Sequence, residues 1–271
     1  MDWIERNGVG LRYELSGEGP GTLVLVHEMG GTLDSWNQVL PLLRTPTKVL
    51  RFDTRGAGLS TKVRGTASID DMTSDVAALL DVVKENSPVT IVGVAVGGAI
   101  ALHFAAKYAE RTRAVIAFGP AIGVSDERRP AVLSHADFVE KNGVLAIAEA
   151  ELGRAYPELL RNDRERFEKY RARWLANDPG SYAAIYRMLA TLNLQADLAA
   201  IRCPTYLFAG LHDALRPPEV IEPIARAIAG AQFRGIATGH YAPVHTPELV
   251  AQLIDEALAG GAAGSVEARG G

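Results

Sequence analysis

The 271-residue sequence contains a single cysteine, Cys203, which excludes an intramolecular disulfide framework and a cysteine-rich zinc site. No apolar run reaches the roughly 18 residues that a membrane-spanning helix needs. The N-terminus lacks a basic start followed by an apolar core, so no signal peptide is expected. No block of Lys and Arg occurs and the formal net charge is -4, which argues against nucleic-acid and membrane partners. We therefore expect a cytoplasmic protein.

The composition, 48% hydrophobic and 22% charged, is that of a globular protein. Short apolar runs bounded by Gly or Pro alternate with longer helical patterns, which is typical of an α/β fold with a mostly parallel sheet and helices on both faces. The predicted strands are 23–26, 49–52, 89–92, 114–118, 205–208 and 232–236, preceded by an antiparallel hairpin within 3–15. The predicted helices of this layer are 69–84, 98–108, 218–229 and 246–258.

The stretch 121–200 contains no strand pattern and breaks this alternation. Its helical patterns are 127–141, 144–155, 163–176 and 181–192. We interpret 121–200 as a helical cap inserted into a core made of residues 1–120 and 201–259. The Gly/Ala-rich tail, 260–271, is expected to be disordered.

Four short segments follow predicted strands, where open parallel sheets place their sites. They are His27-Glu28-Met29-Gly30-Gly31, Asp53 to Ser60, Gly93-Val94-Ala95-Val96-Gly97-Gly98, and Asp213 together with Gly239-His240. Their order and spacing resemble the α/β-hydrolase superfamily over residues 3–259, and most of all its esterase and 3-oxoadipate enol-lactonase branch. The resemblance implies an α/β-hydrolase fold and, as substrate, a small ester, lactone or related carbonyl compound.

The third segment departs from the family pattern at the nucleophile. The family turn is G-x-S-x-G, with the serine held on a strained strand-to-helix turn. Here the frame is Gly93 to Gly97, and its centre is Ala95. A methyl group cannot attack a carbonyl, so no acyl-enzyme can form at this position.

The other members of the family's site are present by the same resemblance. Asp213 matches the triad acid and His240 the base, while the backbone N–H groups of Met29 and Val96 match the oxyanion hole. Glu28 stands where the family usually has glycine. It either points outward, is protonated by burial and donates a hydrogen bond, or acts as an acid or base itself.

The remaining candidates concern binding. Trp174 and Tyr186 in the cap are predicted to reach into a substrate pocket, although helical spacing fits the cap core as well. His27 is interpreted as a brace under the oxyanion loop rather than as a catalyst. Arg128, Arg129 and Arg187 are interpreted as surface charges rather than as carboxylate anchors. No dinucleotide or phosphate-binding motif and no metal-ligand spacing occurs, so no cofactor or metal is implied.

Three hypotheses stay open. The first is a hydrolase of a small ester, lactone or related carbonyl compound whose serine is replaced by Ala95, the usual substitution for trapping a substrate. The second is a natural hydrolase or lyase that needs no serine and uses His240, with or without Glu28, as its acid or base. The third is a non-catalytic binder of small molecules. The sequence does not determine the substrate or the oligomeric state.

Overall fold

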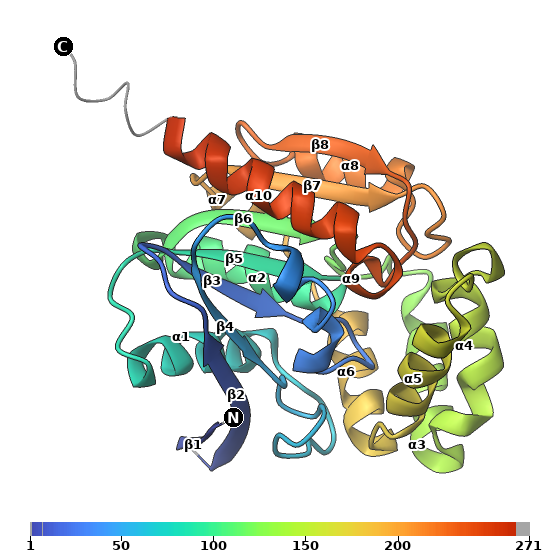
Figure 1. Ribbon diagram of the computed structural model, residues 1–271. Coiled ribbons are helices and arrows are strands. Elements are labelled where there is room, and N and C mark those ends of the chain that lie inside the picture. Colours follow the sequence, from blue (N-terminus) through green and yellow to red (C-terminus); the bar gives the residue numbers. More distant parts are fainter. Residues whose placement is uncertain (1, 7, 264–271) are drawn as a thin grey trace.

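The computed structural model describes residues 2–6 and 8–263 and has an eight-stranded sheet at its centre (Figure 1). The strand order is β1-β2-β4-β3-β5-β6-β7-β8. The β1–β2 and β2–β4 pairs are antiparallel and the rest are parallel, as the hairpin prediction and the α/β prediction require. The strands are β1 (Asp2–Arg6), β2 (Val9–Ser16), β3 (Thr22–Val26), β4 (Lys48–Phe52), β5 (Val89–Val94), β6 (Thr112–Phe118), β7 (Thr205–Gly210) and β8 (Gln232–Ile236).

Helices cover both faces of the sheet because the central strands bury side chains on both sides. Along β3, Val24 and Val26 join one apolar cluster while Leu23 and Leu25 join another. The first cluster packs under α1 (Ile69–Val82), α2 (Val96–Lys107), α7 (Gln195–Ala200) and α8 (Pro218–Arg226), and the second under α10 (Pro247–Ala263). Figure 1 shows α10 in front of the sheet and α2 behind it.

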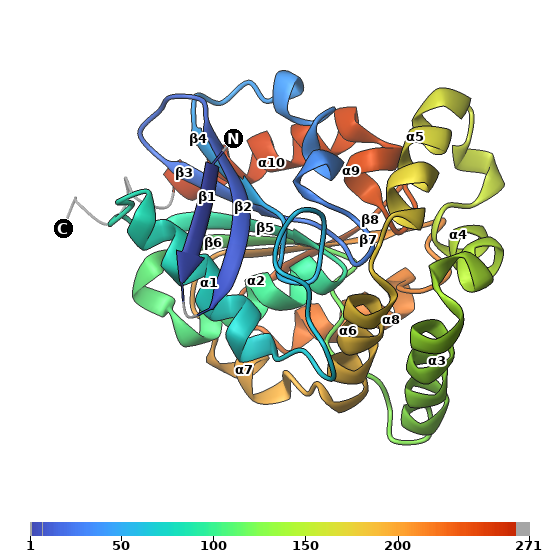
Figure 2. The ribbon, with the colours of Figure 1, turned by 90° about the horizontal axis from the view of Figure 1, so that it is seen from below.

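Between β6 and β7 the chain is helical, and all of these helices except the last, α7, lie beyond the carboxyl ends of the strands (Figures 1 and 2). They are α3 (Arg129–Asn142), α4 (Ala148–Ala155), α5 (Arg164–Leu175), α6 (Pro179–Thr191) and α7. Residues of α3, α4 and α5, together with Tyr182 of α6, form a third apolar cluster, rich in aromatic rings, which also takes in Tyr241 and Val244 from the core. Because α7 packs on α2, the last residues of the predicted cap lie against the core.

Two features differ from the sequence-based expectation. The helix α10 continues to Ala263, so the first four residues of the predicted tail, 260–263, are helical, and the others lie outside the described residues. A short helix, α9 (Ala242–His245), precedes α10 in a stretch for which no helix was predicted. The short helix places the residues after His240 against the cap cluster.

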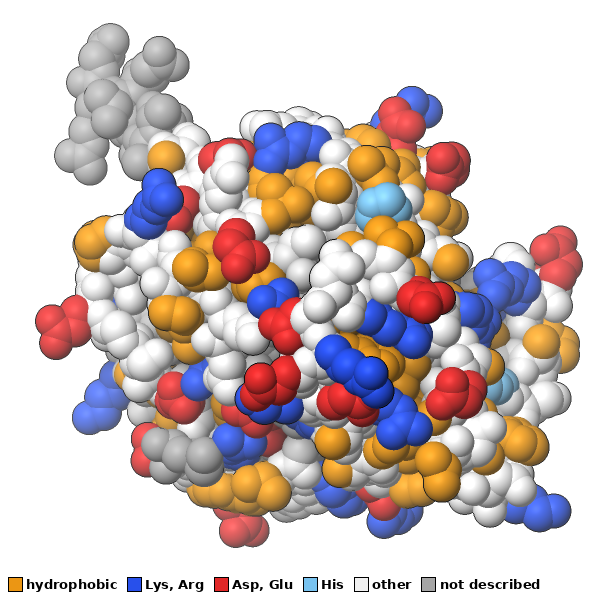
Figure 3. All heavy atoms as spheres, turned by 45° about the vertical axis from the view of Figure 1, so that its right-hand side comes forward, with side chains coloured by type: hydrophobic (Ala, Val, Ile, Leu, Met, Phe, Trp, Pro, Cys, Tyr) orange, Lys and Arg blue, Asp and Glu red, His pale blue; other side chains and the backbone are white. Residues whose placement is uncertain are grey.

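The surface agrees with the lack of charged blocks in the sequence. Figure 3 shows positive and negative side chains interspersed on the face that it presents, with no continuous area of one sign. Among the described residues, no helix is long and apolar enough to span a bilayer.

Candidate active site

Ala95 occupies a strained turn between β5 and α2. Its backbone has φ 50° and ψ −110°, a conformation that costs a residue with a side chain about 1–3 kcal/mol. The turn is tight enough to need glycine beside it, because a Cβ on Gly97 would lie 2.6 Å from the carbonyl oxygen of His27. The chain therefore keeps the conformation expected of a nucleophile elbow and presents a methyl group there.

His240 and Asp213 form the hydrogen-bonded pair expected from the sequence. The Nδ1 atom of His240 lies 2.8 Å from Oδ2 of Asp213, and since a carboxylate can only accept, the imidazole carries its proton on Nδ1. The other carboxylate oxygen, Oδ1, accepts hydrogen bonds from the backbone N–H groups of Leu215 (2.8 Å) and Arg216 (3.0 Å). The Nε2 lone pair of His240 is thus left free to accept a proton.

The carboxyl of Asp213 is suited to remain charged in this buried position. Burial acts to raise the pKa of Asp213, but the nearby His240 and the two backbone donors outweigh it and hold the pKa below its ordinary value. A permanent carboxylate fixes the orientation of the ring and stabilises the imidazolium that forms when Nε2 takes up a proton.

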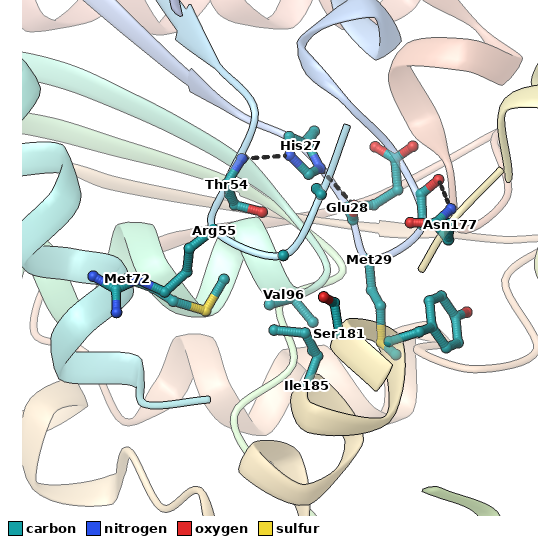
Figure 4. A pocket seen from close by; sticks show the side chains of 14 residues that line it. His27, Glu28, Met29, Thr54, Arg55, Met72, Val96, Asn177, Ser181 and Ile185 are labelled. Atoms are coloured by element: carbon teal, nitrogen blue, oxygen red, sulfur yellow. Dashed lines mark hydrogen bonds between the residues drawn. The ribbon is translucent and has the colours of Figure 1, made fainter. Parts of the chain in front are cut away.

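The two predicted oxyanion donors, Met29 and Val96, border the same cavity as Ala95 and His240. Val96 is the first residue of α2. The first N–H groups of this helix have no partner within the helix, and they form the positive end of the helix dipole. The loop that carries Met29 is fixed by His27. That ring donates from Nδ1 to the carbonyl of Glu28 (2.7 Å) and accepts at Nε2 from the N–H of Thr54 (3.0 Å), as Figure 4 shows.

Glu28 is buried, so the expectation that it points outward is wrong. Its Oε1 accepts hydrogen bonds from Ser35 (2.8 Å) and from the hydroxyl of Tyr170 in α5 (3.1 Å). Figure 4 shows the side chains of Glu28 and Met29 leaving the loop on opposite sides. Glu28 does not border the cavity of Ala95 and His240, and its carboxyl group lies on the side of the loop away from Met29. Its contacts join the oxyanion loop to the cap.

The main cavity, which lies between these loops and the cap, has a volume of about 530 Å³. Tyr186 borders it, together with Tyr182 of the cap and Tyr241 of the core. Trp174 does not: its side chain is fully buried in the cap cluster, and it packs over Gly30, where a Cβ would lie 2.5 Å from its Nε1. Of the two interpretations of the cap aromatics, the cap core is therefore the correct one for Trp174.

Sequence reasoning missed several polar groups of this cavity. Arg216 borders it three residues after Asp213, and the only signal for it was that closeness in sequence. His135 and Glu151 border it from α3 and α4, with His135 Nε2 3.5 Å from Glu151 Oε1. Nothing in the sequence brings these two residues together. Among the described residues, no group of three or more His, Cys, Asp or Glu side chains could hold a metal ion.

Comparison with known proteins places this arrangement in context. The model of the family described as "Serine aminopeptidase, S33" matches residues 18–236. An esterase from Thermogutta terrifontis, solved with malate bound, is 30% identical with a TM-score of 0.88, covering 96% of this chain and 99% of that one. An enol-lactonase from Burkholderia xenovorans LB400 is 25% identical with a TM-score of 0.87, covering 95% and 100%. The 3-oxoadipate enol-lactonase 2 of Acinetobacter baylyi is 24% identical, covering 95% and 96%.

Proposed function

The chain belongs to the serine aminopeptidase S33 family of α/β-hydrolases, and from that premise we propose that it acts on a small ester, lactone or related carbonyl compound by proton transfer at His240, without an acyl-enzyme. The observation that carries the proposal is the His240–Asp213 hydrogen bond of 2.8 Å on the same cavity as Ala95. The similarity to an esterase and to two enol-lactonases supports the class of substrate.

The proposed hydrolysis uses water where the family uses serine. His240 Nε2 takes a proton from a water molecule while the water oxygen forms a bond to the substrate carbonyl carbon. The electron pair of the C=O bond moves onto the carbonyl oxygen. The N–H groups of Met29 and Val96 donate hydrogen bonds to that oxyanion. The C=O bond then forms again as the C–O bond to the leaving group breaks. The imidazolium then returns its proton to the leaving oxygen.

Substrates with an acidic hydrogen next to a carbonyl admit a second use of the same groups. His240 would remove that proton, the two N–H groups would stabilise the enolate oxygen, and the imidazolium would return the proton as the enolate collapses to the product. Asp213, Met29 and Val96 have the same roles in both reactions, and the methyl group of Ala95 reacts in neither. Glu28 has no chemical role in either, because its carboxylate is turned away from the cavity and bound to Ser35 and Tyr170.

Turnover of the chain as it stands tests the proposal. The substrates are p-nitrophenyl acetate, a set of enol-lactones and a set of β-dicarbonyl compounds. Replacing a positioned general base typically lowers the rate by about 10²–10⁴-fold, so we expect His240→Ala to lose activity by that factor. His212→Ala is the control, since His212 is an exposed histidine on the loop of Asp213. Turnover that is equal in the chain and in His240→Ala would contradict the proposal, and binding of these compounds without turnover would favour a binder.

The location in the cytoplasm and the absence of nucleic-acid and membrane partners stay predictions from the sequence.

A further inference from the structure

Two arginines border the main cavity without a carboxylate partner. Arg128 directly precedes α3, and Arg216 lies in the loop after β7. Within the part of the chain that the structure describes, neither guanidinium forms an ion pair. The hydrogen bond of the Arg216 guanidinium goes to the neighbouring carbonyl of Leu215, at 2.9 Å from Nη1. Both guanidinium groups thus border the cavity without an ion-pair partner among the described residues.

Arg216 is held close to the proposed catalytic pair. Its backbone N–H donates to Asp213, and its stem passes Gly119, where a Cβ would lie 3.4 Å from Arg216 Cβ and 3.2 Å from Asp213 Oδ2. The oxygens of Asp213 are already taken by His240 and by two backbone N–H groups. Within the described residues, Asp213 forms no ion pair with the guanidinium of Arg216.

Arg128 and Arg216 border the same cavity, and their like charges act on each other. Burial lowers the pKa of Arg216, the negative charge of Asp213 opposes that effect, and the positive charge of Arg128 adds to the lowering. An arginine stays charged in proteins even so. An anion bound between the two groups would remove this repulsion and fill the donor positions that the chain leaves open.

The other arginines of the cap nearby are partnered within the chain. Arg129 pairs with Asp126 and also donates to the carbonyl of Ala190 at 2.9 Å. Arg154, also on the cavity, pairs with Glu151, and Arg187 pairs with Asp137 and Glu140. Arg129 and Arg187 are thus paired with carboxylates and do not border the cavity, whereas Arg128, an exposed charge as interpreted from the sequence, also borders the cavity.

We propose that Arg128 and Arg216 form an anion subsite, so that the substrate is a small ester, lactone or related carbonyl compound that carries a free carboxylate. The substrate class rests on the proposed function, while the subsite itself does not. The planar guanidinium matches a carboxylate with two parallel hydrogen bonds. With its carboxylate held there, the substrate extends through the cavity toward Ala95 and His240.

Binding of glutarate tests the subsite, because it needs no turnover. Glutarate is titrated into the full chain by calorimetry, with neutral glutaramide and inorganic phosphate as the other probes. Hydrogen bonds to charged groups are worth about ten- to a hundredfold in affinity. We expect Arg128→Gln and Arg216→Gln each to weaken glutarate binding by about that factor, while the matched variant Arg129→Gln leaves it unchanged. Glutaramide should bind at least tenfold more weakly than glutarate.

Three results would overturn the proposal: glutaramide binding as tightly as glutarate, phosphate binding more tightly than glutarate, or Arg129→Gln losing as much affinity as Arg128→Gln. Arg128 is exposed and borders the cavity, so Arg128→Gln should fold normally. This variant alone tests the subsite if Arg216→Gln does not fold. Glutarate binding with the expected variant effects, together with no turnover of any ester or lactone, would refute the proposed reaction and keep the anion subsite.

Discussion

His245 makes the stability of this protein sensitive to mild acid. The imidazole is buried, with 6% of its surface exposed, and among the described residues neither ring nitrogen has a hydrogen-bond partner. It packs against the ring of Tyr156, with the centroids 4.1 Å apart. Burial, and next the charge of His240, lower the pKa of His245 from 6.5 to about 3 in the folded protein. The folded state therefore resists a proton that the unfolded chain accepts.

The sign and size of the effect follow from that difference. Between pH 6.5 and 3 the unfolded state binds more protons than the folded state, so the free energy of unfolding decreases as the pH falls through this range. Each pH unit below 6.5 costs about 1.4 kcal/mol, so the loss between pH 7 and pH 5 is about 2 kcal/mol from this group alone.

Urea unfolding at pH 7 and pH 5 measures this loss. His245→Phe keeps a planar ring and removes both nitrogens, so its stability should fall by about 2 kcal/mol less than that of the unchanged chain over the same interval. The control is His212→Gln, which replaces an exposed histidine and should follow the unchanged chain. The carboxylates contribute equally to all three proteins and cancel. Identical pH dependence in His245→Phe and in the unchanged chain would refute the reasoning.

Two further predictions concern packing. Gly97→Ala should destabilise the protein by about 3 kcal/mol in thermal or urea unfolding, because its Cβ would meet the backbone of His27. The matched change Gly153→Ala, in α4 with no atom within 4 Å of its Cβ, should stabilise the protein by about 1 kcal/mol. Equal unfolding midpoints for the two variants would contradict the close contact between β3 and α2 at the elbow. Tyr170→Phe should destabilise by about 1 kcal/mol, because Glu28 loses a buried donor, and an unchanged urea midpoint would argue against that bond.

The parts of the fold that repeat a local pattern could be predicted from the sequence. Runs such as 23–26 and 89–92 are rich in β-branched and apolar residues and buried throughout, since both faces of the sheet are covered, and each lies within an observed strand, β3 and β5. The end of the last helix was placed too early because Gly260 and Gly261 indicate a break, whereas α10 continues through both.

The site residues also separate into those that a local sequence pattern indicates and those that it does not. Ala95, Asp213 and His240 follow strand ends in fixed order, so a resemblance could indicate them. The burial of Glu28 depends on Ser35 and on Tyr170, 142 residues further along the chain, and no local pattern carries that contact. Trp174 and Tyr186 both lie in cap helices, and the sequence does not distinguish them. The packing of Trp174 over Gly30 places it in the cap core, whereas Tyr186 borders the cavity.

The central claim is that every part of a serine hydrolase site except the nucleophile is in place around Ala95. The direct measurement is a pre-steady-state assay of Ala95→Ser with p-nitrophenyl acetate, with mass spectrometry of the intact protein. Loss of the serine costs triad hydrolases about a millionfold, so we expect hydrolysis to rise by several orders of magnitude, with a burst of nitrophenol and one acetyl group added at position 95. The double variant with His240→Ala should lose both. A correctly folded Ala95→Ser protein with no burst and no added acetyl group would contradict the account.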